Sequence, residues 1–213
     1  MQIETEALIF DMDGLLIDSE PVWGEVEREL ARGHGLTAWS DEVAARCVGK
    51  GLAHLVAVMR EVAGLPLSVS AGVEALVDGF IARVGTLSLQ PGAGALLDAS
   101  EGLPRALATS SPRRLAEAVL AHFGLASRFD VVVTASDVAH AKPAPDIFLA
   151  AVRGLGTRGV VLEDSLAGVT AARAAELTVI AVPEHAPERF APLTPYVAAD
   201  LIEARTWLHF KRA

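Results

Sequence analysis

Residues 7–14 read ALIFDMDG, and this short stretch indicates the fold class before any other part of the chain. Four apolar residues, 7–10, are followed at once by Asp11, Asp13 and Gly14. An apolar run of this length that ends in acidic and glycine residues is typical of a buried parallel strand and its exit turn. We therefore expect a strand over residues 7–10, with both aspartates at its carboxyl end.

Comparable runs recur through the second part of the chain and alternate with helical stretches. The strand-like runs lie at 105–109, 130–134, 159–162 and 178–182, and the helical stretches at 112–123, 145–155, 165–175 and 201–210. Alternation at this spacing predicts an α/β fold with a Rossmann-like, doubly wound parallel sheet. In the helix at 112–123, Ser111 is expected as the N-cap, Pro112 as the first helical residue, and Gly124 just past the end.

The segment from residue 20 to residue 85 breaks this rhythm, because it contains only helical patterns. They lie at 21–33, 41–48, 53–62 and 71–84. A chain of 213 residues is long enough for one core with an inserted subdomain. We expect residues 1–18 and 87–213 to form the α/β core domain, and residues 19–86 to form a helical cap subdomain inserted after the first strand.

Composition and charge exclude several classes of protein. Hydrophobic residues make up 52% of the chain, which is enough for a packed core, and no apolar run approaches the ~18 residues of a membrane span. The first residues, MQIETE, are acidic where a signal peptide is basic, so we expect a cytoplasmic protein. A net charge of −9 argues against a nucleic acid partner, and the single cysteine, Cys47, excludes an internal disulfide. We expect a monomer.

The carboxyl ends of the predicted strands carry a set of polar residues that suits phosphate chemistry. Ligands of open α/β sheets bind at these ends. The residues found there are Asp11, Asp13, Thr109, Ser110, Ser111, Lys142, Glu163, Asp164 and Ser165. Each alone has an ordinary structural explanation, since Asp, Ser and Thr often cap helices. Their occurrence at four strand ends together indicates a site for a phosphate ester.

Each residue type has a physical task at such a site. Carboxylates without His or Cys suit a hard cation such as Mg²⁺, and a carboxylate can attack phosphorus to form an aspartyl phosphate. Hydroxyls with the amide groups of the following helix can hold phosphate oxygens. The ammonium of Lys142 can neutralise charge on the phosphoryl group.

Four motifs make the pattern recognisable. They are DMDGLLIDSEP at 11–21, TSS at 109–111, KPAPD at 142–146 and EDSLAG at 163–168. With these motifs the chain resembles the haloacid-dehalogenase-like phosphohydrolase superfamily, in its beta-phosphoglucomutase-like and sugar-phosphate phosphatase subgroup. The resemblance implies an α/β core, a helical cap that closes over the active site, Mg²⁺ as cofactor and a small phosphate ester as substrate.

The resemblance also implies residue roles. Asp11 would be the nucleophile, and Asp13 the general acid–base, which also gives its backbone carbonyl to the metal. The implied catalytic residues are Asp11, Asp13, Ser110 and Lys142. The implied metal ligands are Asp11, Asp13, Glu163 and Asp164. The candidate substrate-binding residues are Thr109, Ser110, Lys142, Lys50 and Trp23.

Two of these candidates lie in the predicted cap and have open alternatives. Lys50 is either a substrate contact or a solvated lysine in a glycine-flanked loop. Trp23 either lines the substrate site or holds the first cap helix in place. Beta-phosphoglucomutases usually carry a histidine at the position of Trp23, so the residue resembles the hexose- and hexitol-phosphate phosphatases instead.

The function that these observations favour is a Mg²⁺-dependent phosphatase. It would hydrolyse a small phosphorylated metabolite, a sugar or polyol phosphate, through an aspartyl-phosphate intermediate. One alternative is a beta-phosphoglucomutase-type mutase, which returns the phosphoryl group to the sugar. An alternative of another class is a non-catalytic, receiver-like phosphorylation switch, which also combines Asp, Ser or Thr, and Lys on an α/β sheet.

Overall fold

The structure is a computed structural model that describes residues 2–47 and 51–211. These residues fall into two compact units. One contains the described residues up to Asp18 and those from Ser88 onward, and the other runs from Ser19 to Leu87. No helix in the described part of the chain has the length and apolar character needed to cross a membrane.

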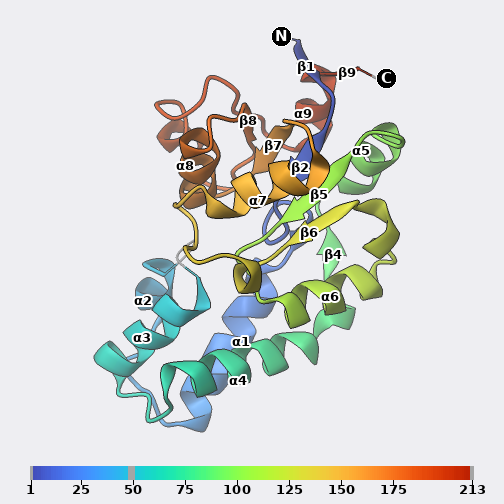
Figure 1. The fold of residues 1–213 in the computed structure, drawn as a ribbon. Coiled ribbons are helices and arrows are strands. Elements are labelled where there is room, and N and C mark those ends of the chain that lie inside the picture. The colour runs from blue at the N-terminus through green and yellow to red at the C-terminus, as the bar shows by residue number, and fades with distance from the viewer. Residues whose placement is uncertain (1, 48–50, 212–213) are drawn as a thin grey trace. The chain divides into compact units, whose positions relative to one another are not determined.

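A five-stranded parallel sheet forms the centre of the first unit (Figure 1). The strand order is β6-β5-β2-β7-β8, with β6 at Val131–Val133, β5 at Arg105–Ala108, β2 at Leu8–Phe10, β7 at Val160–Glu163 and β8 at Val179–Ala181. In the central strand, Leu8 is paired with Arg105 on one side and Val160 on the other. The predicted α/β fold and its parallel sheet are confirmed. Since all strands are parallel, their carboxyl ends share one edge of the sheet.

Helices α7 (Asp146–Leu155) and α8 (Leu166–Ala174) cover one face of this sheet (Figure 1). Phe148 of α7 and Val169 of α8 belong to one buried cluster with Ile9, Ala106 and Val161 of the strands. This packing buries the strands on that face and explains their nearly continuous apolar sequences. The unit also contains α5 (Ala93–Ala99), α6 (Arg113–His122), α9 (Leu201–Trp207) and a small antiparallel pair of β3 (Ile17–Asp18) with β4 (Ser88–Leu89).

The predicted helix over residues 201–210 is wrong in its last three residues. Helix α9 ends at Trp207, and Leu208–Phe210 forms strand β9. This strand is parallel to β1 (Ile3–Thr5), with Ile3 opposite Leu208 (Figure 1). A short apolar segment takes the conformation that its partner strand allows, and that partner comes from the other end of the chain.

The start of α6 also differs from the prediction by one residue. Pro112 has an extended backbone, with φ −61° and ψ 152°, so it is the N-cap and the helix begins at Arg113. Ser111 therefore lies before the cap, and its hydroxyl is not used to cap α6. The end of the helix is as predicted, because Gly124 follows the C-cap Phe123 with a positive φ of 65°.

The second unit is helical over its described residues. It contains α1 (Glu20–Gly33), α2 (Asp41–Ala45), α3 (Leu52–Ala63) and α4 (Val69–Ile81), and its fully buried side chains include Val56, Met59, Leu76 and Phe80. Helix α4 packs against both α1 and α3. Helices α2 and α4 end earlier than predicted, at Ala45 and Ile81. The role of this unit as a cap remains a prediction.

Candidate active site

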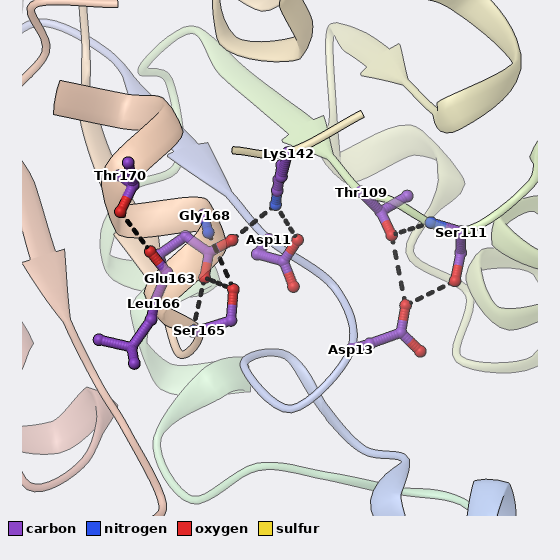
Figure 2. A network of polar contacts seen from close by, with 10 residues as sticks. All are labelled: Asp11, Asp13, Thr109, Ser111, Lys142, Glu163, Ser165, Leu166, Gly168 and Thr170. Atoms are coloured by element: carbon purple, nitrogen blue, oxygen red, sulfur yellow. Dashed lines mark hydrogen bonds and ion pairs between the residues drawn. The ribbon is translucent and has the colours of Figure 1, made fainter. Parts of the chain in front are cut away.

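Three residues from separate strand ends meet at the carboxyl edge of the sheet. Asp11 follows β2, Glu163 ends β7, and Lys142 lies in the loop between β6 and α7. The Nζ atom of Lys142 donates to Asp11 Oδ1 at 2.5 Å and to Glu163 Oε1 at 2.6 Å (Figure 2). The Lys142 side chain is only 4% exposed, and its ammonium also lies 5.0 Å from the centre of the Phe148 ring. A buried ammonium is thus held between two buried carboxylates.

The site carries more negative than positive charge. Asp11, Glu163 and Asp164 each offer an oxygen, and these oxygens lie within 4.8 Å of one another. Burial raises the pKa of Asp11 to about 8, although the Lys142 ammonium acts in the opposite direction. Burial and the carboxylates of Glu163 and Asp11 also raise the pKa of Asp164 well above its ordinary range. When all three carboxyl groups are ionised, as they must be to bind a cation, the one ammonium leaves a deficit of two positive charges.

That deficit and the donor set both fit a divalent cation. The cluster offers only carboxylate oxygens, which hard cations such as Mg²⁺ prefer over softer metals. The structure thus brings together the side chains of three of the four residues predicted to bind the metal. The fourth, Asp13, was predicted to contribute its backbone carbonyl to the metal.

Two glycines make room for the acidic side chains. Gly14 has a positive φ of 78°, and a Cβ atom there would lie 2.2 Å from Asp164 Oδ2. A Cβ atom on Gly168 would lie 1.6 Å from Glu163 Oε1. The second oxygen of Glu163, Oε2, accepts from the backbone N–H of Ser165 at 2.7 Å and from its hydroxyl at 3.0 Å. The glycines of the first and fourth motifs are therefore needed for the carboxylates to pack closely.

Asp13 has a different environment from Asp11. Its Oδ2 atom accepts from Ser111 Oγ at 2.7 Å and from Thr109 Oγ1 at 3.3 Å (Figure 2). Thr109 is fully buried at the end of β5, and Ser110 follows it with a partly exposed side chain. Thr109 therefore lies at the carboxyl edge of the sheet, as predicted from its place in the sequence, and also contacts Asp13.

The predicted residues of the second unit are placed as follows. The ring of Trp23 packs on Phe80, with 4.3 Å between the ring centres, so it contributes to the packing of α1 against α4. Lys50 lies outside the described residues. The roles predicted for both residues toward a substrate remain predictions.

Sequence reasoning missed one contact at this edge of the sheet. Ser111 was expected as a helix cap and as one of the polar residues at the strand ends, but not as a partner of Asp13, which its hydroxyl binds. The signal available was its place in the motif TSS. His140 lies in the loop that contains Lys142, where its backbone N–H and Nδ1 both contact Asp146 Oδ2, at 3.2 and 2.8 Å.

A surface cavity of about 290 Å³ lies elsewhere on the first unit. Its lining includes Gly159, Thr178 and Glu6, which lie near the amino ends of the strands. None of the motif residues that meet at the carboxyl edge lines this cavity. Its position therefore does not suggest a second place for the chemistry.

Comparisons with known proteins agree with the motifs and the geometry. The family model of haloacid dehalogenase-like hydrolases matches residues 5–176. The chain is 34% identical to the fructose-1-phosphate phosphatase YqaB of Escherichia coli K12, over 82% of this chain and 95% of that protein. It is 33% identical to hexitol phosphatase B of the same organism, over 92% and 96%.

A solved structure shows the same similarity. CbbY from Rhodobacter sphaeroides, in complex with phosphate, superposes with a TM-score of 0.85 at 29% identity, over 93% of this chain and 96% of that one. The non-catalytic switch considered above is therefore set aside. The chain belongs to the haloacid dehalogenase-like hydrolases, and it is a phosphomonoester hydrolase of that family.

Proposed function

We propose that this enzyme is a Mg²⁺-dependent phosphatase that hydrolyses a phosphorylated sugar or polyol through an aspartyl-phosphate intermediate. One observation carries the proposal: the buried Asp11 carboxylate lies 2.5 Å from the Lys142 ammonium and beside two further carboxylates. The names of the two Escherichia coli relatives, a fructose-1-phosphate phosphatase and a hexitol phosphatase, support the substrate class.

In the first step, a carboxylate oxygen of Asp11 attacks phosphorus and the bond from phosphorus to the leaving oxygen breaks. Asp13 gives its proton to that leaving oxygen, so the alcohol departs neutral. In the second step, water attacks phosphorus, Asp13 takes the proton of the water, and the bond between phosphorus and Asp11 breaks. Inorganic phosphate and the starting enzyme result.

Lys142 and the residues after β5 hold the transferring group in this proposal. The Lys142 ammonium offsets negative charge on Asp11 and on the phosphoryl oxygens as they approach each other. The side chain of Ser110, a partly exposed residue, would donate to a phosphoryl oxygen. Thr109, the other candidate, accepts from the backbone N–H of Ser111 at 3.0 Å and so also fixes the turn. Positioning and charge neutralisation supply most of the acceleration in phosphoryl transfer.

The metal would be held by Asp11 and Asp164, with Glu163 beside them and the backbone carbonyl of Asp13 as a further ligand. When bound, Mg²⁺ supplies positive charge that offsets the charge of the carboxylates and the phosphoryl group. Glu163 also keeps Lys142 in place through its Oε1 atom. Glu163 would therefore have two tasks, to hold Lys142 and to bind the metal.

Hydrolysis is favoured over mutase activity because of Trp23. A mutase must protect its aspartyl phosphate from water until a sugar hydroxyl returns. Trp23, which packs on Phe80, cannot exchange a proton at neutral pH. We expect water to accept the phosphoryl group instead.

The test is a phosphate-release screen over phosphorylated sugars and polyols with Mg²⁺ or with EDTA. We expect turnover with Mg²⁺, none in EDTA, and loss of several orders of magnitude in Asp11→Asn. Asp98→Asn is the control, because Asp98 is an exposed carboxylate paired with Arg128. Full activity in EDTA or in Asp11→Asn would refute the proposal.

The mutase alternative is tested with β-glucose 1-phosphate and Mg²⁺, with and without glucose 1,6-bisphosphate, followed by phosphorus NMR. Release of inorganic phosphate from this or another hexose phosphate, without accumulation of glucose 6-phosphate, supports hydrolysis. Conversion to glucose 6-phosphate with little free phosphate would identify a mutase.

A further inference from the structure

We propose that Ser111 is a positioning residue for Asp13, and that its hydroxyl fixes the orientation of the Asp13 carboxyl group toward the substrate. The proposal rests on the role of Asp13 as general acid–base in the proposed function. It assigns a task to a residue that the motif pattern alone presents as a helix cap.

Three hydrogen bonds join Asp13, Thr109 and Ser111 in a closed ring, and two of them end on the same oxygen, Asp13 Oδ2. Ser111 Oγ donates to Asp13 Oδ2 at 2.7 Å, and Thr109 Oγ1 donates to the same oxygen at 3.3 Å (Figure 2). The backbone N–H of Ser111 donates to Thr109 Oγ1 at 3.0 Å. Since this amide occupies a lone pair of the Thr109 hydroxyl, the hydroxyl proton is directed toward Asp13. Ser111 thus acts on Asp13 directly and also through Thr109.

The ring distinguishes the two oxygens of the Asp13 carboxyl group. Oδ2 accepts from both hydroxyls, so the position of this oxygen is fixed. Two contacts to one oxygen also fix the direction in which Oδ1 points. We infer that this fixed orientation of the carboxyl group is what Ser111 contributes to acid–base catalysis by Asp13.

The two segments that carry these residues, the turn at 109–111 and the loop after Asp13, are each attached to other parts of the first unit. Thr109 N–H donates to the carbonyl of Val133, and the carbonyl of Ser111 accepts from Ala135 N–H, so the turn is attached to β6 and its exit. On the other side, the loop after Asp13 is closed by hydrogen bonds from Leu16 and Ile17 to the carbonyl of Met12. A carboxyl group held between two fixed segments keeps its orientation.

A purely structural role does not account for the Ser111 hydroxyl. The N-cap of α6 is Pro112, so this hydroxyl satisfies none of the amide groups at the helix start. The first helical amide, that of Arg113, donates instead to Ser136 Oγ at 3.3 Å. Ser111 is 6% exposed, and within residues 2–47 and 51–211 its hydroxyl donates to Asp13 and to no other residue.

The proposal predicts a dependence on the leaving group. An alkoxide leaves poorly unless it is protonated, whereas p-nitrophenolate leaves without a proton. Loss of a positioned acid therefore slows cleavage of an alkyl phosphate more than cleavage of p-nitrophenyl phosphate. The parameter kcat/KM is the one to compare, because it covers events only up to release of the first product.

The experiment measures kcat/KM of Ser111→Ala with p-nitrophenyl phosphate and with a sugar or polyol phosphate that the enzyme hydrolyses. A hydrogen bond to a charged group corresponds to about ten-fold or more in rate. We expect the sugar or polyol phosphate to lose about ten-fold more than p-nitrophenyl phosphate. Ser111→Thr, which keeps a hydroxyl, is expected to retain the wild-type ratio of the two substrates.

Two controls separate this role from others. Ser100→Ala removes another buried serine hydroxyl, which donates to the carbonyl of Leu97, and is expected to leave the ratio unchanged. In an Asp13→Asn background, Ser111→Ala is expected to add no further loss, because Ser111 acts through Asp13. Equal losses on both substrates, or a full further loss in that background, would overturn the proposal.

Failure of the proposed function gives a different result. If Asp13→Asn by itself hydrolyses the sugar or polyol phosphate at the wild-type rate, Asp13 is not the acid–base group. The proposed function and the positioning role of Ser111 are then both refuted. If Asp13→Asn is impaired and Ser111→Ala keeps the wild-type ratio, only the role of Ser111 is refuted.

Discussion

Replacement of Gly168 by alanine should displace the Glu163 carboxylate and thereby loosen Lys142. Gly168 lies in the first turn of α8, where a Cβ atom would be 1.6 Å from Glu163 Oε1 and 1.9 Å from its Cδ. These are covalent distances, so the methyl group and the carboxylate cannot occupy the same region. The Glu163 side chain must leave its position, because the backbone of the helix is held by its own hydrogen bonds.

The expected cost follows from the contacts that Glu163 would lose. It accepts from Lys142 Nζ at 2.6 Å and from the Ser165 N–H at 2.7 Å. Hydrogen bonds to charged groups contribute about 1.5–3 kcal/mol each, or about 3–6 kcal/mol for the two. Alanine in place of a helical glycine stabilises the helix by about 1 kcal/mol, which offsets part of this loss. The free energy of unfolding should therefore fall by about 2–5 kcal/mol.

The expected loss of stability differs between protein in EDTA and protein with Mg²⁺, because the net charge of the site differs. Without metal, removal of one of three neighbouring carboxylates relieves part of their repulsion, so we expect about 2 kcal/mol in EDTA. With saturating Mg²⁺ the repulsion is already offset, and the loss should be larger. We expect kcat/KM to fall by at least about ten-fold, because Lys142 loses one of the two carboxylates that hold it.

Urea denaturation followed by circular dichroism measures the stability, and phosphate release measures the activity. Gly33→Ala is the matched control, since no atom lies within 4 Å of the position its Cβ would take. It should be neutral or more stable by up to about 1 kcal/mol. A Gly168→Ala protein with wild-type stability and activity would show that the close packing of Glu163 on α8 is not required.

Two predictions concern pH. Burial raises the pKa of Glu27 in α1 to about 7 from its ordinary 4.5, so neutral Glu27 favours the folded state fully below pH 4.5 and this contribution is lost as the pH rises through about 7. Glu27→Gln should thus gain about 1–2 kcal/mol over wild type in urea denaturation at pH 8 and nothing at pH 4.5; an equal effect at both values would contradict the burial argument. Because burial raises the pKa of Asp11 to about 8, metal-free protein holds a proton there at pH 7, and Mg²⁺ binding should release it. Calorimetric titration of Mg²⁺ in two buffers with different ionisation enthalpies should therefore give different heats, and identical heats would count against a protonated Asp11.

Local pattern predicted most of the sheet because the buried strands are short, apolar and bounded by polar turns. The strand at β2 was expected over residues 7–10 and is formed by Leu8–Phe10, and β5, β6 and β8 also lie within their expected ranges. Strand β7 was expected over 159–162 and extends one residue further, to Glu163. The end of the last helix was predicted wrongly for the opposite reason. Whether Leu208–Phe210 continues a helix or forms a strand depends on β1, about 200 residues away in sequence.

The candidate site shows the same division. Parallel strands place their carboxyl ends along one edge, so the residues that would meet there could be named from the motifs alone. Which of their atoms form hydrogen bonds with one another could not be predicted in this way. The four motifs contain several carboxylates and hydroxyls but one lysine, and no local pattern indicates that Ser111 donates to Asp13 or that Gly168 accommodates Glu163.

By itself, then, the sequence determined the order along the chain of the five central strands, the chemistry offered at each strand end and the family to which the chain belongs. These features depend on neighbours a few residues apart, where backbone geometry and apolar spacing act directly. Only the tertiary structure decided that Lys142 binds Asp11 across 131 residues, that Asp13 is held by two hydroxyls, and that the chain ends pair as β1 and β9. Such contacts form when packing of the whole sheet and its helices fixes side chains to within a fraction of an ångström, and no local pattern carries that information.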